Sequence, residues 1–481
     1  MSRCAHYASE VGDCTPVPLN DVPKHSLHAE AAQHFYVREN SPKVPSLKRG
    51  TPSMTTITAD EPHAKIPPKA LMAVVIGNWL EFYDFIVYSF FSVQIGKAFF
   101  PGDDVYMSLL FASLVFWAGF LTRPIGAAVI GAYADRAGRR AAMTLTILLM
   151  ALGTGMLAFT PGYAVIGIYA PVLLVTARLI QGFSCGGEVG PATTYLLEAA
   201  SPKERSAYTA WQGISQQFAG IMGSGLGLIL AFNLSSADLD SWGWRIPFLI
   251  GILIGPIGLY IRRALPETIE KHEVHESGVA VIQNLFKSST PAVFLGVLCI
   301  VGPTVSTYVS AYMTSYAVTA LQLPNASGQF ITLCGYIAAL AGFPIGAWFS
   351  DRIGPKPAIL IPRLLFIGIV YQAYVMMTAP GITLENLVLI NVTLNFILAV
   401  SYGGLYALLT QAFPKAVRST GTSIAYAIGV TVFGGSTQPV LTWLIKTLED
   451  PLVPAWYQIG ANALAIIGVL LITMHKDDKA K

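Results

Sequence analysis

Long apolar runs alternate with short polar joints from Lys69 to the end of the chain. A helix that crosses a bilayer needs about 20 predominantly apolar residues, and these runs reach that length. The chain is 53% hydrophobic and only 12% charged, whereas a soluble domain is about one-quarter charged. Together these properties predict a polytopic, all-α membrane protein.

Twelve runs are long enough to form transmembrane helices. They lie near 70–97, 106–131, 142–160, 166–199, 207–232, 244–263, 291–320, 326–350, 358–379, 384–413, 421–444 and 454–475. The widest break, 264–290, is polar and charged and divides the runs into two sets of six. We therefore expect two pseudo-symmetric six-helix bundles over 67–263 and 291–475, a cytoplasmic linker over 264–290 and a cytoplasmic tail over 476–481.

Residues 1–66 are polar, with scattered Pro and His, and we expect a disordered cytoplasmic tail there. Met54 is an alternative start that would leave only a short leader, so it stays open whether residues 1–53 belong to the mature protein. The five cysteines show no metal-binding or redox spacing, so we expect free thiols, no metal and no cofactor. No HExxH, GxSxG or GxxxxGK[ST] pattern occurs in a catalytic context, which argues against an enzyme.

Positive charge alternates strictly along the joints. The joints after even-numbered runs carry Arg136, Arg139, Arg140, Lys203, Arg205, Arg262, Arg263, Lys271, Lys287, Arg352, Lys356, Lys415 and Arg418. The opposite joints carry mainly the acids Asp103, Asp104, Asp238, Asp240 and Glu385. Basic loops remain in the cytoplasm. We therefore expect a multi-pass protein of a plasma membrane, such as the bacterial inner membrane, with both termini cytoplasmic.

A ten-residue pattern recurs at the same place in both sets of runs. GAYADRAGRR (131–140) follows the second run, and AWFSDRIGPK (347–356) follows the eighth. The recurrence predicts two parallel repeats with an alternating-access site between them. We expect these loops to latch the cytoplasmic side, although setting the topology alone would also explain the charges. The candidate gating residues here are Asp135, Arg136, Arg139, Arg140, Asp351 and Arg352.

The segment RLIQGFSCGGE places polar residues in the middle of the fourth run. Arg178, Gln181, Cys185 and Glu188 follow 3, 4, 3 spacing and so share one helical face. An Arg at the centre of a membrane helix costs about 2.5–3.5 kcal/mol on insertion scales and usually faces protein or a water-filled cavity. We interpret this face as the wall of a transport pathway. The alternative is a buried ion pair that only fixes helix packing.

The first copy of the repeated loop resembles the loop signature of the major facilitator superfamily, through Gly131, Asp135, Arg136, Gly138, Arg139 and Arg140. The second copy departs from it at its first position, where Ala347 replaces Gly. The resemblance implies a twelve-helix fold of two bundles. The departure puts in doubt only how strongly the C-terminal copy latches.

Six motifs resemble the metabolite:proton symporter group of that superfamily, and the resemblance covers about residues 70–475. They are GNWLEFYDF (77–85), RPIGA (123–127), RLIQGFSCGGE (178–188), AWQGISQQ (210–217), WGWRIPF (242–248) and VRSTG (417–421). Within the group, Trp211, Gln212, Gln216 and Gln217 are similar to the citrate and tricarballylate carriers. The resemblance therefore implies a proton-coupled carrier of a tricarboxylate.

Two carboxylates, Glu81 and Asp84, lie three residues apart in the first run. Close like charges in a low-dielectric setting favour reversible protonation of one of them. We predict that Glu81 or Asp84 carries the proton, with Arg178 as its ion partner and Glu188 as a further coupling candidate. The alternative is that the acid only holds Arg178 and never titrates.

Binding a tricarboxylate, with about two to three negative charges, requires fixed cations and hydrogen-bond donors. Arg178 supplies a planar fork for a carboxylate, and Gln181, Gln212 and Gln216 supply neutral donors. The alternative is that these glutamines only form hydrogen bonds between neighbouring helices, each of which contributes about 0.6–2 kcal/mol. Arg123 is either functional, as the resemblance implies, or extends to the cytoplasmic surface.

The C-terminal set of runs offers neutral donors and no mid-run acid. The candidates are Thr304, Tyr308 and Tyr312 in the seventh run and Asn391, Asn395, Tyr402 and Tyr406 in the tenth. We interpret them as the second wall of a substrate site, the alternative being polar bonds between helices. Arg418, at the start of the eleventh run, is expected to be a cytoplasmic gate residue.

The sequence thus predicts a symporter that imports a proton together with a tricarboxylate such as citrate or tricarballylate. A dicarboxylate or a zwitterionic osmolyte stays open as the substrate, and sodium stays open as the coupling ion. Protonation of the acid in the first run is expected to release Arg178 for substrate, and linkage makes this coupling reciprocal. The expected partners are a small organic anion, a proton and the bilayer, with no nucleic acid and a monomeric state.

Overall fold

The computed structural model describes residues 68–137, 139–187, 189–253 and 278–475, and the regular secondary structure in these ranges is helical. The predicted tails over 1–66 and 476–481, and Glu188, lie outside the described residues. We call residues 68–253 the N-terminal half and residues 278–475 the C-terminal half.

The N-terminal half forms a series of helices broken at short turns. They are α1 (Pro68–Phe90), α2 (Ser92–Phe99), α3 (Val105–Leu121), α4 (Arg123–Ala137), α5 (Arg139–Phe159), α6 (Tyr163–Ile166), α7 (Tyr169–Ser184), α8 (Val189–Glu198), α9 (Arg205–Thr209), α10 (Trp211–Asn233) and α11 (Ser236–Ser241). A 3₁₀ turn, Cys185–Gly187, lies between α7 and α8. A further apolar helical segment runs from Gly243 to Leu253.

The C-terminal half contains longer uninterrupted helices. They are α13 (Gly278–Thr319), α14 (Asn325–Ile353), α15 (Pro355–Met377), α16 (Leu384–Tyr402), α17 (Leu405–Gln411), α18 (Arg418–Gly429), α19 (Gly435–Leu448) and α20 (Val453–Leu471). A π-helical segment, Val430–Gly434, joins α18 to α19.

Eight described helical segments are long and apolar enough to cross a membrane. They are Val105–Ile130, Arg205–Asn233, Ser289–Thr319, Asn325–Ile353, Pro355–Met377, Leu384–Gln411, Arg418–Leu448 and Val453–Leu471. The other four predicted runs are also helical where they are described: as α1 with α2, as α5, as α7 with α8, and as the segment that ends at Leu253. The prediction of an all-α membrane protein is confirmed.

The linker predicted over 264–290 is partly helical. Its end belongs to α13, which begins at Gly278 and is kinked at Ser289, two residues before Pro291. Because residues 254–277 lie outside the described residues, the boundaries of the two bundles stay predictions.

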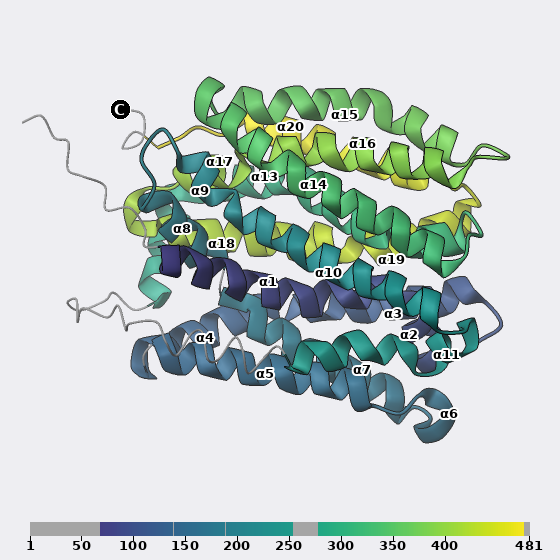
Figure 1. The fold of residues 1–481 in the computed structure, drawn as a ribbon. Coiled ribbons are helices and arrows are strands. Elements are labelled where there is room, and N and C mark those ends of the chain that lie inside the picture. Colours follow the sequence, from purple (N-terminus) through teal and green to yellow (C-terminus); the bar gives the residue numbers. More distant parts are fainter. Residues whose placement is uncertain (1–67, 138, 188, 254–277, 476–481) are drawn as a thin grey trace, which may run out of the picture. The chain divides into compact units, whose positions relative to one another are not determined.

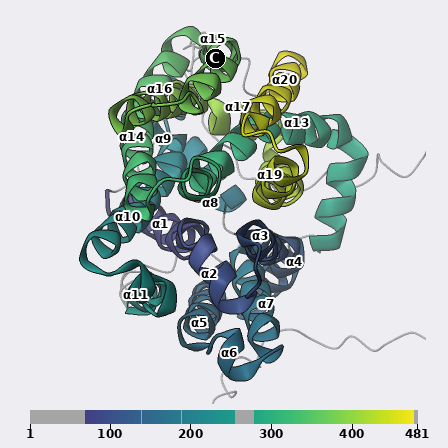
Figure 2. The ribbon, with the colours of Figure 1, turned by 90° about the vertical axis from the view of Figure 1, so that its right-hand side faces the viewer.

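The long helices run side by side, and most connections between them lie at the two ends (Figures 1 and 2). The two halves pack against each other along α10 and α14, α3 and α19, and α8 and α18. At the first of these contacts, a Cβ on Gly213 would lie 2.0 Å from Cε1 of Phe343. Glycine at this position therefore allows the Phe343 ring to pack directly on the backbone of α10.

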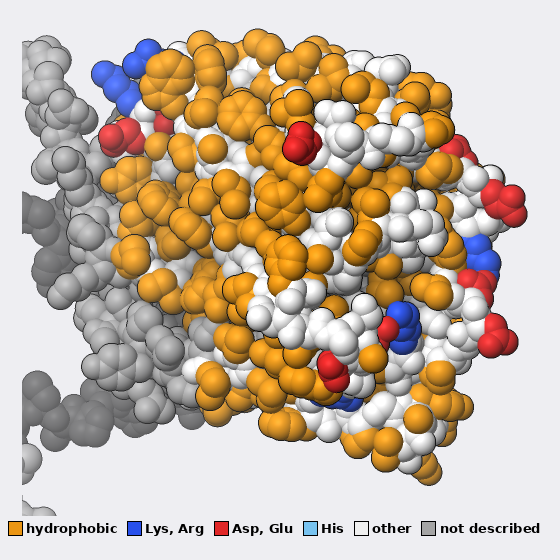
Figure 3. Space-filling model, turned by 45° about the vertical axis from the view of Figure 1, so that its right-hand side comes forward, with side chains coloured by type: hydrophobic (Ala, Val, Ile, Leu, Met, Phe, Trp, Pro, Cys, Tyr) orange, Lys and Arg blue, Asp and Glu red, His pale blue; other side chains and the backbone are white. Residues whose placement is uncertain are grey.

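The described surface is largely apolar. Figure 3 shows hydrophobic side chains across the middle of one face, with Lys, Arg, Asp and Glu mostly toward its ends. Large apolar side chains such as Phe232 and Leu253 are more than two-thirds exposed. Exposed apolar surface on this scale matches a lipid environment, because contiguous patches on soluble proteins are usually limited to a few hundred Å².

Candidate functional site

A narrow pocket lies where the two halves meet. It is lined by Phe82, Phe85, Ile86, Gln216, Gln217, Thr307, Tyr308 and Tyr336. These residues come from α1 and α10 in the N-terminal half and from α13 and α14 in the C-terminal half. Gln216 and Tyr308, both predicted substrate ligands, therefore reach the same pocket from opposite halves.

Two buried arginines, Arg123 and Arg178, contact the ring of Phe85, which lines this pocket. The guanidinium of Arg123 lies 4.4 Å from the centre of the Phe85 ring, and that of Arg178 lies 5.2 Å from it. Arg178 also lies 3.8 Å from the Tyr88 ring, while Arg123 lies 4.4 Å from the Phe120 ring. Aromatic faces attract cations, so these rings stabilise both guanidiniums in the way that an anion would.

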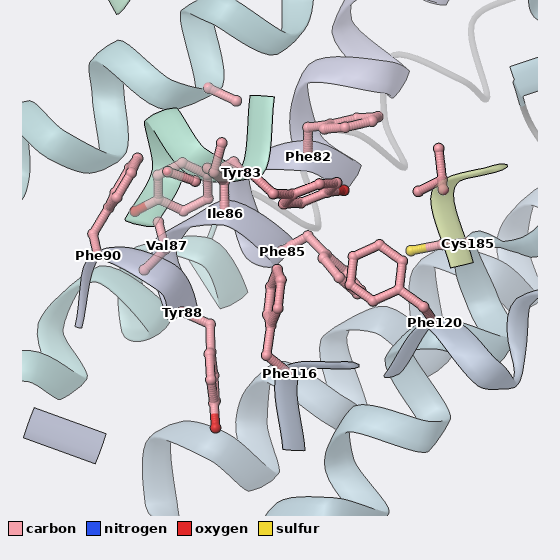
Figure 4. Close-up of a cluster of buried hydrophobic side chains, with 14 of the residues drawn as sticks. Phe82, Tyr83, Phe85, Ile86, Val87, Tyr88, Phe90, Phe116, Phe120 and Cys185 are labelled. Carbon is pink, nitrogen blue, oxygen red and sulfur yellow. The ribbon is translucent and has the colours of Figure 1, made fainter. Parts of the chain in front are cut away.

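The aromatic cluster around Phe85 is continuous between α1 and α3. The Phe85 ring lies 5.4 Å from that of Phe116 and 4.7 Å from that of Phe120, and Figure 4 shows these rings grouped together. Tyr308, from the C-terminal half, packs edge-on against Phe120 at 5.4 Å. Phe85 therefore lies between the pocket and the two arginines.

Arg123 is 6% exposed. The prediction left open whether this side chain extends to the surface, and the structure is against that alternative. Its guanidinium is enclosed by two phenylalanine rings instead, because α4 begins at Arg123 beside the end of α3.

A chain of hydrogen bonds joins Arg178 to Asp84 across three helices. Arg178 Nη1 donates to Gln181 Oε1 at 2.8 Å, and Gln181 Nε2 donates to Thr154 Oγ1 at 2.9 Å. Thr154 Oγ1 in turn donates to Asp84 Oδ2 at 3.0 Å. We call this set the N-terminal relay. It joins a fixed cation on α7 to a carboxylate on α1 through two neutral groups.

The predicted direct ion pair between Arg178 and an acid of the first run is wrong for this structure. Neither Glu81 nor Asp84 lies within 4 Å of the Arg178 nitrogens among the described residues. Aromatic rings and the Gln181 amide occupy the space around the guanidinium instead. Nε and Nη2 of Arg178 have no hydrogen-bond partner within the described ranges.

Asp84 points into the N-terminal half rather than into the pocket. It is 7% exposed, it accepts from Thr154 on α5, and a Cβ on Gly251 would lie 2.3 Å from its Oδ1. Glu81 is similarly buried, at 8% exposure. Both candidate proton carriers are thus inside the protein, whereas Glu188 lies outside the described residues.

The predicted glutamine ligands divide into two groups. Gln212 Nε2 donates to Asn78 Oδ1 at 2.8 Å, and Asn78 Nδ2 donates to the Gln212 carbonyl at 2.9 Å. These bonds join α1 to α10 and match the alternative of a helix-packing role. Gln216 instead lines the pocket and donates to the Tyr406 hydroxyl of the opposite half at 3.4 Å.

Most polar side chains predicted for the second wall bond other helices. Asn391 Nδ2 donates to the Ile331 carbonyl on α14 at 2.8 Å, and Asn395 Oδ1 accepts from Ser310 Oγ on α13 at 2.7 Å. The Tyr312 hydroxyl accepts from Thr442 at 2.9 Å, and the Tyr402 hydroxyl donates to the Pro303 carbonyl at 3.2 Å. Tyr308 is the member of this predicted set that lines the pocket.

Sequence analysis overlooked a fully buried arginine, Arg363 on α15. Its Nη1 donates to Asn462 Oδ1 on α20 at 3.5 Å. A single cation inside the otherwise apolar run 358–379 was the signal that would have identified it.

One end of the helices carries contacts that cross between the halves. The Asp351 carboxylate at the end of α14 accepts from the backbone N–H groups of Ser206 at 2.8 Å and Ala207 at 2.9 Å. These N–H groups belong to the first turn of the Arg205–Asn233 span, where a carboxylate is favoured by the helix dipole. Arg418 Nη1 lies 3.6 Å from Glu198 Oε1, which links α18 to α8.

The other predicted gating residues form no described contact between the halves. The Arg352 guanidinium lies 4.1 Å from the ring of Trp348 on its own helix. Asp135, Arg136, Arg139 and Arg140 belong to α4 and α5, but their side chains lie outside the described set. The second copy of the repeated loop therefore has a contact that the described residues resolve, and the first does not.

The opposite end of the helices is also closed by contacts between the halves. Asp104, the N-cap of α3, forms an ion pair with Lys446 in the last turn of α19. The Tyr106 hydroxyl donates to the Thr319 carbonyl at 2.9 Å. The Lys446 ammonium, which donates to the Asp104 carboxylate, holds the pKa of that carboxyl below its usual range.

Known proteins share both the sequence and the fold of this chain. The family model of the Major Facilitator Superfamily matches residues 74–439. A citrate-proton symporter of Salmonella typhi is 34% identical over 412 residues, covering 85% of this chain and 94% of that protein. Another from Klebsiella pneumoniae is 35% identical over 404 residues, covering 83% and 90%.

Relatives with other substrates are nearly as similar. A proline/betaine transporter of Salmonella typhimurium is 30% identical over 417 residues, covering 84% of this chain and 82% of that protein. Among solved structures, a D-xylose-proton symporter matches with a TM-score of 0.69 at 18% identity, covering 86% of this chain and 99% of that one. At this identity the structural match concerns the fold. The chain therefore belongs to the Major Facilitator Superfamily, and it is a multi-pass membrane transporter rather than an enzyme.

Proposed function

We propose that this protein is a proton-coupled symporter of a tricarboxylate, with citrate as the first candidate. The observation that carries the proposal is the pair of buried guanidiniums, Arg123 and Arg178, around Phe85 at the pocket between the halves. Arginine recognises carboxylates through paired N–H groups. Citrate-proton symporters at 34% and 35% identity support the same substrate class.

The N-terminal relay supplies a physical route from proton to substrate. With Asp84 ionised, each hydrogen bond in the relay points toward the carboxylate, so the charge of Arg178 is partly neutralised at a distance. A proton on Asp84 removes that negative charge and leaves the Arg178 cation available for a substrate anion. By linkage, the bound anion then favours the protonated acid to the same extent.

We infer that Asp84 carries the proton, with Glu81 and Glu188 as the remaining candidates. Asp84 is the acid that the relay joins to Arg178, and its second oxygen, Oδ1, has no hydrogen-bond partner among the described residues. That oxygen can accept a proton without breaking an existing bond.

Alternating access in this proposal requires the two closed ends to open in turn. The Asp351 cap and the Arg418–Glu198 pair close the end that carries the basic loops, which we assign to the cytoplasm of a bacterial inner membrane. The Asp104–Lys446 pair closes the external end. Rocking of one half over the other would break one set while keeping the other.

A second candidate function is transport of a zwitterion, and the 30% identical proline/betaine transporter favours it. A zwitterion needs a guanidinium for its carboxylate and either an acid or aromatic faces for its cationic group. In the described pocket the side chains are aromatic, aliphatic or neutral polar, with no acid among them. Because aromatic faces also bind cations, the preference for a tricarboxylate rests on the two buried arginines and on the citrate-proton symporters at 34% and 35% identity.

Uptake into proteoliposomes tests the proposal. Labelled citrate and tricarballylate are supplied under an inward proton gradient, an inward sodium gradient or neither, with unlabelled succinate, proline and betaine as competitors. We expect accumulation driven by the proton gradient and competition strongest from the tricarboxylates. Betaine or proline uptake without citrate uptake would reject the anion assignment, and accumulation under sodium alone would reject proton coupling.

A further inference from the structure

Arg363 is a further buried cation, and no acid of the described C-terminal half forms an ion pair with it. The side chain is 0% exposed, and its one hydrogen bond in the described part of the chain is the 3.5 Å contact from Nη1 to Asn462 Oδ1. Nε and Nη2 have no hydrogen-bond partner there. In a guanidinium these two nitrogens form the edge that donates two parallel bonds to a carboxylate.

The acids of the C-terminal half lie at the ends of the membrane helices or in the connections between them, and none lies in the middle of a helix. Over residues 291–475 they are Asp351, Glu385, Glu449 and Asp450, each in a terminal turn, at a helix cap or in a connection. No carboxylate oxygen lies within 4 Å of Arg363 among the described residues. A buried charge without a counter-ion is strongly unfavourable. The Asn462 amide and the Tyr402 ring compensate this charge only in part, and a bound anion would supply the rest.

The surroundings of Arg363 reproduce those of Arg178. In each half Nη1 donates to a side-chain amide oxygen, that of Gln181 or that of Asn462. The amide nitrogen then donates to a hydroxyl: Gln181 to Thr154 at 2.9 Å, and Asn462 to Ser306 at 3.0 Å. We call the second set the C-terminal relay. In both sets Nε and Nη2 of the arginine are buried and have no hydrogen-bond partner among the described residues.

Four helices of the C-terminal half pack around Arg363: α13, α15, α16 and α20. Gly302 on α13 provides the room, because a Cβ there would lie 2.7 Å from Nη1 of the guanidinium. The Tyr402 ring on α16 lies 5.8 Å from the guanidinium.

Tyr402 lies between Arg363 and the interface between the two halves. Its ring is 5.7 Å from that of Phe343, which packs on Gly213 of the N-terminal half. Phe85 has the corresponding place in the N-terminal half, between Arg178 and the pocket. Separation of the halves at Phe343 would therefore free Tyr402 to move and open a route to Arg363.

We propose that Arg363 binds a carboxylate of the transported anion and is the cationic anchor of the C-terminal half. The inference rests on the proposed function and names a residue of its substrate site. One carboxylate binds on the Arg178 side in one half, and another binds the open edge of Arg363 in the other. A substrate with two or more carboxylates is then bound by both halves.

Binding and thermal stability of an Arg363→Met variant test this role together. Replacing an uncompensated buried charge with an apolar side chain of similar length is often neutral or stabilising. We expect the ligand-free variant to unfold at the wild-type temperature or above it. We also expect its citrate Kd, measured by calorimetry in nanodiscs, to rise by at least about tenfold, which a purely structural arginine would not cause.

Two further variants sharpen the test. Lys356→Met removes one positive charge from the same helix, and it should leave the citrate Kd unchanged. Gly302→Ala keeps the charge but pushes against Nη1, so it should weaken citrate binding even if Arg363→Met fails to fold. Both Arg363→Met and Gly302→Ala should weaken citrate more than butyrate, a monocarboxylate, because a single carboxylate cannot bind both anchors.

The outcomes separate this inference from the proposed function. Wild-type protein that binds no citrate would reject the function. Wild-type protein that binds citrate, together with an Arg363→Met variant of equal Kd, would reject the role of Arg363 alone. A wild-type thermal shift by chloride as large as that by citrate would also reject the role of Arg363, because the site would then bind a small inorganic anion.

Discussion

The N-terminal and C-terminal relays share one pattern and differ in how they end. In both, a buried arginine donates to an amide, and the amide donates to a hydroxyl. The N-terminal relay continues from Thr154 to the Asp84 carboxylate. The C-terminal relay reaches Ser306, and no acid follows in the described residues.

This difference gives the two halves separate tasks. A guanidinium that is joined to a titratable acid can alter its affinity for an anion with protonation, whereas one without an acid holds a constant charge. We therefore infer that proton coupling belongs to the N-terminal half and that the C-terminal half contributes affinity alone.

The largest expected effect comes from removing the cation of the N-terminal relay. Arg178→Met should reduce citrate uptake by about 100-fold or more, because truncating a buried charge partner costs about 2–5 kcal/mol. Arg178→Lys should recover only a fraction, since an ammonium lacks the planar edge for a carboxylate. Proteoliposome uptake measures both variants. Near-wild-type uptake by Arg178→Met would contradict the role of Arg178 in substrate binding.

Removal of the acid should separate coupling from transport. Asp84→Asn keeps a hydrogen-bonding group beside Thr154 but cannot exchange a proton. We expect proton-driven accumulation to be lost while exchange of external for internal citrate continues. Glu81→Gln is the matched variant one helical turn away. If both variants still accumulated citrate against its gradient under a proton gradient, neither acid would be the carrier.

The two hydroxyls offer a matched pair of smaller changes. Thr154→Val removes the group between Gln181 and Asp84, and a lost buried hydrogen-bond partner costs about 1–3 kcal/mol. We expect it to lower uptake and to flatten its pH dependence. Ser306→Ala makes the equivalent change in the C-terminal relay and should weaken citrate binding without changing the pH profile. An equal change of pH profile in both variants would contradict the division of tasks.

The smallest effect is expected at the external contact between the halves. Lys446→Gln breaks an exposed pair, worth about 0.2–1 kcal/mol, and should shift the population modestly toward an outward-open state. Lys97→Gln is the control, because it breaks a 2.7 Å pair with Asp240 inside one half. Distances between spin labels at the outer ends of α3 and α19 measure the shift. Equal distance distributions in the two variants would show that Lys446 does not hold the halves together.

The same contact has a defined pH dependence. Because Lys446 lowers the pKa of Asp104, the pair persists at neutral pH and is lost only as the pH falls through that lowered pKa. External acidification within the range of ordinary carboxylates should therefore leave the spin-label distances unchanged. Opening that begins above the usual carboxylate pKa would assign the pH response to another group.

Local sequence patterns predicted the fold and part of the site. Apolar runs of bilayer length identified the helices, because the membrane admits few other structures. Arg178, Gln181 and Asp84 were identified because they are polar residues inside such runs, and a charged side chain within a membrane helix is energetically costly and usually functional. The same pattern also marks Arg363 inside the run 358–379, but only the tertiary structure shows its amide partner, Asn462, which lies about a hundred residues away in the sequence.

Sequence alone thus determined the all-helical membrane fold, the division into two sets of runs and the polar face of the fourth run. Only the tertiary structure decided which polar groups meet. It assigned Gln212 to Asn78 and Gln216 to the pocket, although both lie on α10 one turn apart. The physical reason is that helical periodicity fixes the face of a residue on its own helix, whereas its partner depends on how neighbouring helices pack.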